Sequence, residues 1–270
     1  MWGLAFVGAP AKGATPAVVL ALSDTSAQVR RKAAYAVGRI DPDPALAVNA
    51  LVTRLADREE DVRQAAAETL PKMGDAAVPA LIRMLYNDKP NHADVAVRLL
   101  GEIGAGAAPA IGELKKLLLA PSQGLAPAAA EALAKIGGAP AIAVLSAAAV
   151  DDDGTVRGLA VPALQRVGTA AVPALVDLLG AKHVDVRRQA AALLGAMQVN
   201  DKMVVIGLGY ATKDKDFGVR RNALKSLQNM VPVPSWPSRT SPPCWWTSIR
   251  RSARRRSALC KASASIRARD

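Results

Sequence analysis

Apolar residues return along this chain at a fixed spacing. Within each unit they stand 0, 4, 8 and 11 residues after an anchor residue, which is one buried stripe of a helix with about 3.6 residues per turn. The anchors recur every 30 to 33 residues, and the residue four positions later is alanine each time. A period near 30 predicts a solenoid in which copies of one helical unit stack. The anchors are Val29, Val62, His92, Leu125, Val156, Val186 and Val219, and the alanines are Ala33, Ala66, Ala96, Ala129, Ala160, Ala190 and Ala223.

Each unit contains two predicted helices. The first opens on a proline, which suits the first helical position because its missing N–H has no partner there. The second starts near the anchor and ends at a glycine, and its alanine predicts a close helix crossing. Aspartates ahead of it are expected as N-caps. Helix pairs without intervening strands predict an all-α fold. The residues concerned are Pro16, Pro44, Pro79, Pro109, Pro140 and Pro173; Gly74, Gly104, Gly137 and Gly168; and Asp24, Asp57, Asp88, Asp151 and Asp214.

The run from Asp57 through Val62-Arg63 to Leu70, with Met73-Gly74 and Val78-Pro79-Ala80-Leu81 after it, resembles the HEAT repeat. More narrowly it resembles the HEAT-like repeats named after phycobilisome lyases. The resemblance covers about residues 1–230. It implies a right-handed α-solenoid of about seven stacked helix pairs, a HEAT-like superhelix, with outward first helices and second helices lining a concave face. It does not imply one activity, because such folds serve many functions.

Three regions depart from the repeat. In the middle of the array, His92 occupies an anchor position, Ala93 and Ala126 replace a recurrent arginine, and Pro162 falls inside a second helix, which it is expected to kink. Residues 1–13 are interpreted as the remnant of a preceding repeat, residues 14–230 as the array, and residues 231–270 as a basic Ser/Arg/Pro-rich tail. The chain is therefore interpreted as a fragment of a longer repeat protein.

The net charge of +12 belongs mainly to that tail. Residues 231–270 hold nine arginines and lysines against Asp270, a net +8, which leaves 12 − 8 = +4 for the first 230 residues. Three interpretations of the tail stay open: a shifted reading frame, a disordered segment, and a functional basic arm. Only the last would support nucleic-acid binding, since the array lacks a continuous basic track.

No residue pattern in the repeats predicts catalysis, a cofactor site or a metal site. His92 and His183 are the only histidines, and neither is followed by the glutamate found in HEAT-repeat iron hydroxylases. The acidic run Asp151-Asp152-Asp153 lacks the spacing of a calcium loop and is expected to cap and solvate a helix. The recurrent arginine, one position after the anchor and beside a recurrent aspartate, is expected to pair between neighbouring repeats and to tie loops together. Its members are Arg30, Arg63, Arg157, Arg187 and Arg220.

The remaining candidate is the face of the second helices that points away from the buried stripe, at positions 2, 6 and 10 after each anchor. We expect a non-enzymatic protein-binding or scaffolding module that uses this face. The alternatives are a chromophore-lyase-like subunit acting on a phycobiliprotein, and nucleic-acid binding through the tail. The partner is expected to be another protein, the chain a cytoplasmic monomer without a membrane span. The candidate residues are Arg31, Tyr35, Arg39, Glu68, Lys72, Arg98, Glu102, Glu131, Lys135, Arg188, Arg221 and Lys225.

Overall fold

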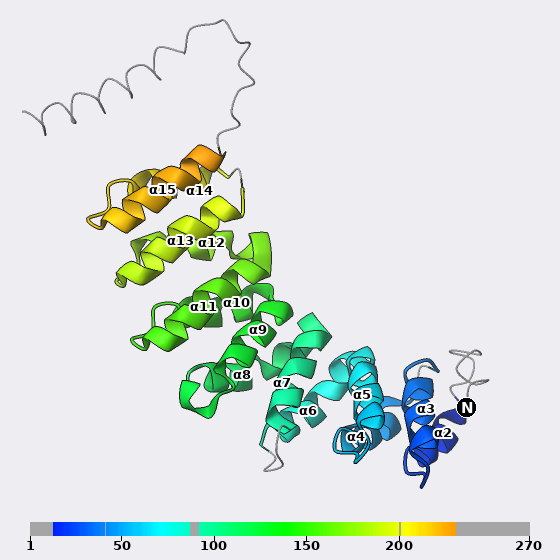
Figure 1. Cartoon of the computed structure of the whole chain (residues 1–270). Helices are drawn as coiled ribbons and strands as arrows, with labels where there is room; N and C mark the ends of the chain where they lie inside the picture. The colour runs from blue at the N-terminus through cyan, green and yellow to red at the C-terminus, as the bar shows by residue number, and fades with distance from the viewer. Residues whose placement is uncertain (1–12, 41, 87–91, 200, 231–270) are drawn as a thin grey trace, which may run out of the picture. The chain divides into compact units, whose positions relative to one another are not determined.

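The computed structural model describes residues 13–40, 42–86, 92–199 and 201–230, and every regular element within them is a helix (Figure 1). The predictions about residues 1–12 and about the tail, residues 231–270, lie outside the described residues. By their contacts, the described residues form one unit. The all-α solenoid predicted from the repeat is confirmed by helix pairs that follow one another in chain order.

Seven helix pairs make up the described array, and we number them as repeats one to seven. Each second helix packs against its own first helix, and first helices also meet those of the next repeat. The pairs are α2 (Thr15–Ala21) with α3 (Ala27–Val37), α4 (Pro44–Arg54) with α5 (Glu60–Thr69), α6 (Val78–Leu85) with α7 (His92–Ile103), α8 (Ile111–Leu118) with α9 (Ala126–Ile136), α10 (Gly138–Ala148) with α11 (Gly154–Val167), α12 (Val172–Asp177) with α13 (Val184–Ala196), and α14 (Lys202–Ala211) with α15 (Phe217–Met230).

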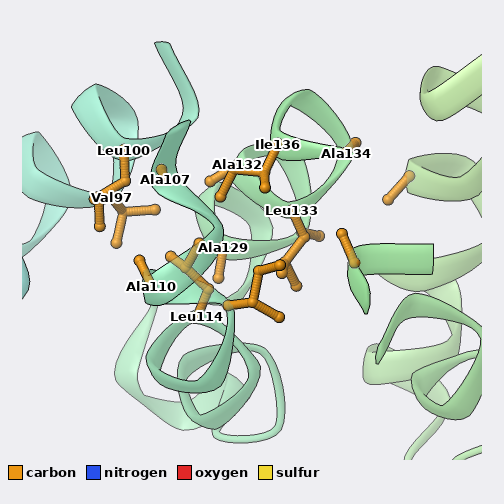
Figure 2. Close-up of a cluster of buried hydrophobic side chains, with 14 of the residues drawn as sticks. Val97, Leu100, Ala107, Ala110, Leu114, Ala129, Ala132, Leu133, Ala134 and Ile136 are labelled. Carbon is orange, nitrogen blue, oxygen red and sulfur yellow. The ribbon is translucent and has the colours of Figure 1, made fainter. Parts of the chain in front are cut away.

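The core is a continuous seam of small and aliphatic side chains between these helices. All seven alanines at position 4 have an exposed fraction of 0%, so this column lies in the core. Figure 2 shows one section of the seam, where Ala129 of α9 lies beside Leu114 of α8, with Val97 and Leu100 of α7 on one side and Leu133 of α9 on the other. Alanine leaves room for two helices to approach, while the leucines fill the space between them.

In four repeats a glycine stands where the chain turns, with a positive φ, between the second helix and the next first helix. Gly74, Gly104, Gly137 and Gly168 have φ values of 58°, 67°, 63° and 85°, which a side chain with a Cβ would disfavour. Prolines open most first helices as expected, at the first or second position of α2, α4, α6 and α12. Short 3-10 helices complete several connections: η2 (Leu70–Ala77), η3 (Gly104–Ala110), η4 (Pro121–Gln123), η5 (Gly168–Ala171) and η6 (Leu178–Gly180).

The prediction that the recurrent aspartates are N-caps of the second helices is wrong by two residues. Asp24, Asp57, Asp151 and Asp214 each accept a hydrogen bond from the backbone N–H two residues on, at 2.7 to 3.1 Å. They therefore close a turn just before the helix. Asp88 lies outside the described residues. Side-chain caps do occur at Asp153 of α11, and at the first helices α4 and α14 through Asp43 and Asp201.

Pro162 falls inside a second helix and Pro71 just after one, with different results. Helix α11 runs through Pro162 from Gly154 to Val167 without interruption. The carbonyl that the ring crowds belongs to Gly158, which is exposed and has open space around its Cα. In repeat two, α5 ends at Thr69, and the chain continues through Pro71 as the 3-10 helix η2.

Two stretches, His92–Leu118 and Gly154–Gly180, are long and apolar enough by composition to cross a membrane. Neither is one straight helix. Gly104 and Gly168 turn the chain within them, so each stretch is a second helix, a 3-10 turn and the next first helix. Their apolar side chains, such as Leu100, Leu114 and Leu164, are buried in the seams between repeats.

Candidate protein-binding face

The recurrent arginine fastens the loop of its own repeat. In Arg30, Arg63, Arg157, Arg187 and Arg220 alike, Nη1 donates to the carbonyl oxygens five and six residues earlier, at 2.7 to 3.1 Å. One guanidinium therefore satisfies two carbonyls of the loop between the two helices. The same contact in five repeats shows that this column has a structural role, as predicted.

Three of these arginines also reach the following repeat. Arg30 donates to both carboxylate oxygens of Asp57 at 2.8 and 2.7 Å, and Arg187 does the same to Asp214 at 2.8 and 3.2 Å. Arg157 binds Asp185 at 3.1 Å. Burial alone would raise the pKa of Asp57, but the hydrogen bonds and charges from Arg30 and its surroundings leave that pKa lowered. The hydrogen bond from Arg187 likewise lowers the pKa of Asp214.

A second contact between repeats was not predicted from the sequence. A glycine at position 9 of one second helix meets a small residue at position 7 of the next: Gly38 meets Thr69, Gly101 meets Ala132, and Gly195 meets Ser226. Thr69 Oγ1 and Ser226 Oγ each donate to a carbonyl of the preceding second helix, at 3.1 and 2.7 Å. At these crossings the two helices approach so closely that a larger side chain would not fit. In the sequence this contact becomes visible only when position 9 of one repeat is compared with position 7 of the next.

The twelve candidate residues do lie on one open face of the second helices. At positions 2, 6 and 10, every residue is exposed except Arg31, which is half-buried. The face is laced by ion pairs: Arg31 with Asp61, Arg98 with Glu102, Lys135 and Arg166 with Glu131, and Arg188 with Asp216. No carboxylate of the described residues pairs with Lys72, Arg221 or Lys225. Exposure makes this face accessible, while its binding role stays a prediction.

The charges on this face alter several pKa values. The hydrogen bond from Arg188 lowers the pKa of Asp216 strongly, and the hydrogen bond to Asp216 raises the pKa of Arg188. Lys135 and then Arg166 lower the pKa of Glu131. Burial raises the pKa of Tyr35, and the nearby Glu68 raises it further. All these shifts favour the charge state that each group already has at neutral pH, including Tyr35, whose phenol stays protonated.

The open face is hollowed between repeats two and three. There the two crossing positions are Pro71 and Leu99, and within repeat two α7 contacts η2 more than α5. A groove of about 420 Å³ remains beside α5. It brings together three of the candidate residues, Glu68, Arg98 and Glu102. Its full lining is Leu55, Glu60, Arg63, Gln64, Ala67, Glu68, Val95, Arg98 and Glu102.

This groove has apolar residues together with a charged lining. Leu55, Ala67 and Val95 are its apolar residues. Arg63 is bound to Glu60, Arg98 to Glu102 at 3.4 Å, and Gln64 donates to Glu68 at 2.8 Å. Three carboxylates against two guanidinium groups leave a formal excess of one negative charge. Such a lining suits an aliphatic side chain with a cation beside it.

The histidines and acidic groups of the described residues form no cluster of three or more that could hold a metal ion. His183 lies just before α13, as predicted, with its Nε2 3.6 Å from Asp152, too far for a hydrogen bond. His92 is half-buried at the start of α7, as expected for its packing position. It lines a hollow of about 320 Å³ on the first-helix side, with Asn49, Thr53 and Arg83.

The geometry and the repeat agree with a family model of HEAT repeats, which matches residues 15–95 and 78–165. These matches together span residues 15–165, more than half of the 270-residue chain. The chain therefore belongs to the HEAT repeat family. No curated protein matches it.

Solved structures similar to this chain include human deoxyhypusine hydroxylase in complex with glycerol, at 24% identity and a TM-score of 0.38, covering 85% of this chain and 88% of that one. The complex of CpcE and CpcF of phycocyanin lyase from Nostoc sp. PCC7120 has 24% identity and a TM-score of 0.38, covering 80% and 94%. A designed armadillo repeat protein has 19% identity and a TM-score of 0.30, covering 80% and 99%. At these identities the likeness concerns the fold alone.

Proposed function

We propose that this chain is a non-enzymatic protein-binding module, and that the groove between α5 and α7 is the centre of its contact surface. The observation that carries the proposal is the opening of the face there, which places Glu68, Arg98 and Glu102 around the half-buried Ala67 and Val95. At three other junctions, where Gly38, Gly101 and Gly195 meet the next repeat, the second helices cross closely. A hollow with an apolar part and a charged rim is the usual anatomy of a protein contact.

The lining also indicates the kind of segment that would bind. Arg63 and Arg98 already have carboxylate partners, so the surplus charge of the rim is negative. A partner segment with a lysine or arginine next to an aliphatic residue would neutralise that surplus and cover Ala67 and Val95. The chromophore-lyase alternative rests on family resemblance, and the nucleic-acid alternative on residues outside the described part. Neither gains support from a described contact.

Site-specific photocrosslinking in cells tests the proposal. A photoreactive amino acid at Gln64 or Glu102 should capture the same partner protein, while one at the exposed Lys115 of α8, on a first helix, should not. The crosslinked peptide of the partner should carry a basic and an aliphatic residue. Glu68→Lys should reduce the adduct at Gln64 without changing the far-UV circular dichroism spectrum, because it reverses the surplus charge.

Two results would contradict the proposal. Capture of the same proteins at Lys115 would mean that the groove has no special role. A measured turnover of any substrate that is abolished by Glu68→Lys or Arg98→Ala would mean that the groove is a catalytic site. The substitution Lys115→Glu is the matched control for the crosslinking and for the turnover measurement. It changes the charge by the same amount as Glu68→Lys, but on the first helix α8.

A further inference from the structure

The last described second helix, α15, has a flank that the preceding second helices bury. The residue five positions after each anchor is buried or half-buried in repeats one to six, from Ala34 to Ala191. In repeat seven this position is Leu224, which is 52% exposed. Phe217, on the same side of α15, is 68% exposed. A large exposed leucine where the array otherwise places small buried residues marks a surface that is shaped for contact.

The two arginines of this flank also have fewer carboxylate partners than the arginines at the same positions of repeats one and six. Arg220 grips its own loop through Nη1, as Arg30 and Arg187 do. The Nε and Nη2 atoms of Arg30 and Arg187 then reach a carboxylate of the next repeat, whereas no described carboxylate pairs with Arg220. Arg221 is in the position of Arg31 and Arg188, which bind Asp61 and Asp216 at 2.7 and 2.6 Å. No described carboxylate pairs with Arg221 either.

The aromatic ring of Phe217 lies beside both guanidinium groups. Arg220 and Arg221 stand 5.9 and 6.0 Å from its ring centre. These cation–π contacts, together with the loop contacts of Arg220, hold the two cations next to exposed apolar surface. We call Phe217, Arg220, Arg221 and Leu224 the terminal flank. It combines two cations with two apolar side chains and contains no acidic residue.

We propose that the terminal flank binds a helix of a different protein, with two carboxylates about four residues apart at its start and an apolar stripe behind them. The model for this contact is the stacking of α5 on α3. There Asp57 accepts hydrogen bonds from Arg30, and Asp61 accepts one from Arg31. The apolar face of α5 covers the flank of α3. The same two arginine positions and the same flank recur on α15, with a larger apolar side chain.

Residues 231–270 do not have the composition of such a helix. Residues 231–270 contain a single acidic side chain, Asp270, and nine arginines and lysines, so their charge repels rather than complements Arg220 and Arg221. The terminal flank and the groove between α5 and α7 share no residue. This inference therefore stands whether or not the groove binds a protein.

A peptide with the required chemistry tests the inference. The probe is an acetylated, fluorescently labelled peptide of residues 55–73, which has Asp57, Asp61 and the apolar stripe of α5. In fluorescence anisotropy with the full chain, we expect saturable binding that weakens with added salt. The double substitution Arg220→Glu and Arg221→Glu should raise the Kd at least about tenfold, as should Asp57→Asn with Asp61→Asn in the peptide.

The control is a full chain with Arg83→Glu and Lys115→Glu, an equal charge change on first helices, which should bind the peptide as the unaltered chain does. Absence of binding up to the solubility limit of the peptide, or equal binding by the Arg220→Glu/Arg221→Glu chain, would overturn the inference. Analytical ultracentrifugation of the full chain supplies the last arm. Self-association that the same double substitution abolishes would show a second copy on the flank, and would also overturn it.

Discussion

Replacing Gly195 by alanine should destabilise the junction between repeats six and seven. A Cβ at this position would lie 2.1 Å from Ser226 Oγ, 2.5 Å from Ser226 Cβ and 2.7 Å from Ser226 Cα. Contacts this short cannot be relieved by rotating one side chain, because the backbone of α15 is among them. The two helices must therefore move apart.

The expected cost follows from three contributions. Overpacking a well-filled contact costs about 1–3 kcal/mol. Moving α15 away weakens the 2.7 Å hydrogen bond from Ser226 Oγ to the Ala191 carbonyl, worth about 1 kcal/mol. Alanine gains about 0.5–1 kcal/mol over glycine in a helix. The net loss should be roughly 1–3.5 kcal/mol. In Gly195→Ala with Ser226→Gly, only part is recovered, because the added Cβ still presses on the backbone of α15.

Urea unfolding followed by circular dichroism, with hydrogen exchange of the α15 amides, measures this effect. The matched control is Gly112→Ala in α8, where a Cβ meets nothing within 4 Å and alanine should stabilise the helix. The two substitutions should therefore shift stability in opposite directions. A Gly195→Ala protein as stable as the Gly112→Ala protein, with unchanged exchange in α15, would show that the close crossing is not present in solution.

Three further predictions concern the packing and the ion pairs. Ala66→Leu or Ala190→Leu should cost on the order of 1–3 kcal/mol in urea unfolding because both alanines are fully buried, whereas the exposed Gln64→Leu should change stability little. Equal shifts in the two classes would refute this assignment of faces. Asp57→Asn should cost about 3 kcal/mol, since it removes the carboxylate from a buried ion pair, while Asp43→Asn, at an exposed N-cap that asparagine also fills, should be nearly neutral. Because the pKa values of Asp57 and Asp214 are lowered in the folded chain, their stabilisation is complete above about pH 4 and is lost as the pH falls through the folded values. Thermal melts of Asp57→Asn should accordingly show a smaller loss between about pH 4 and about pH 2 than melts of the unaltered chain.

The sequence predicts those features that depend on a residue type repeated in every unit. The alanine column, the glycine ends of the second helices and the loop-binding arginines all follow from columns that are nearly uniform. The recurrent aspartates were predicted to be N-caps. They instead lie two residues before the N-cap position and close a turn there. N-caps and turn-closing aspartates have the same composition and differ only in backbone geometry, so the sequence could not separate them.

Features that depend on two different repeats were not visible in the same way. The contact of Gly195 with Ser226 requires one position of repeat six to be read against another of repeat seven. The groove beside α5 similarly depends on Pro71 in one repeat and Leu99 in the next. Neither residue departs from its own helix pattern enough to indicate an opening. The exposed face itself was predictable, because helical periodicity fixes which side points away from the core.

Some arginines hold their own loop and also bind an aspartate of the next repeat. A single helix pair therefore cannot be moved into another repeat protein without separating an arginine from its aspartate. A transplanted repeat six would carry Arg187 but not Asp214. Arg187 would then lack its carboxylate in the new protein, and Asp214 would lack its arginine in the old one. A segment that runs from the middle of one repeat to the middle of the next keeps the arginine and its aspartate together. Joints after repeats three and four, where Ala93 and Ala126 replace the arginine, carry no such tie. Recombination, whether in a genome or in a laboratory, should therefore be tolerated better at these two joints than at those after repeats one, five and six, which Arg30, Arg157 and Arg187 tie.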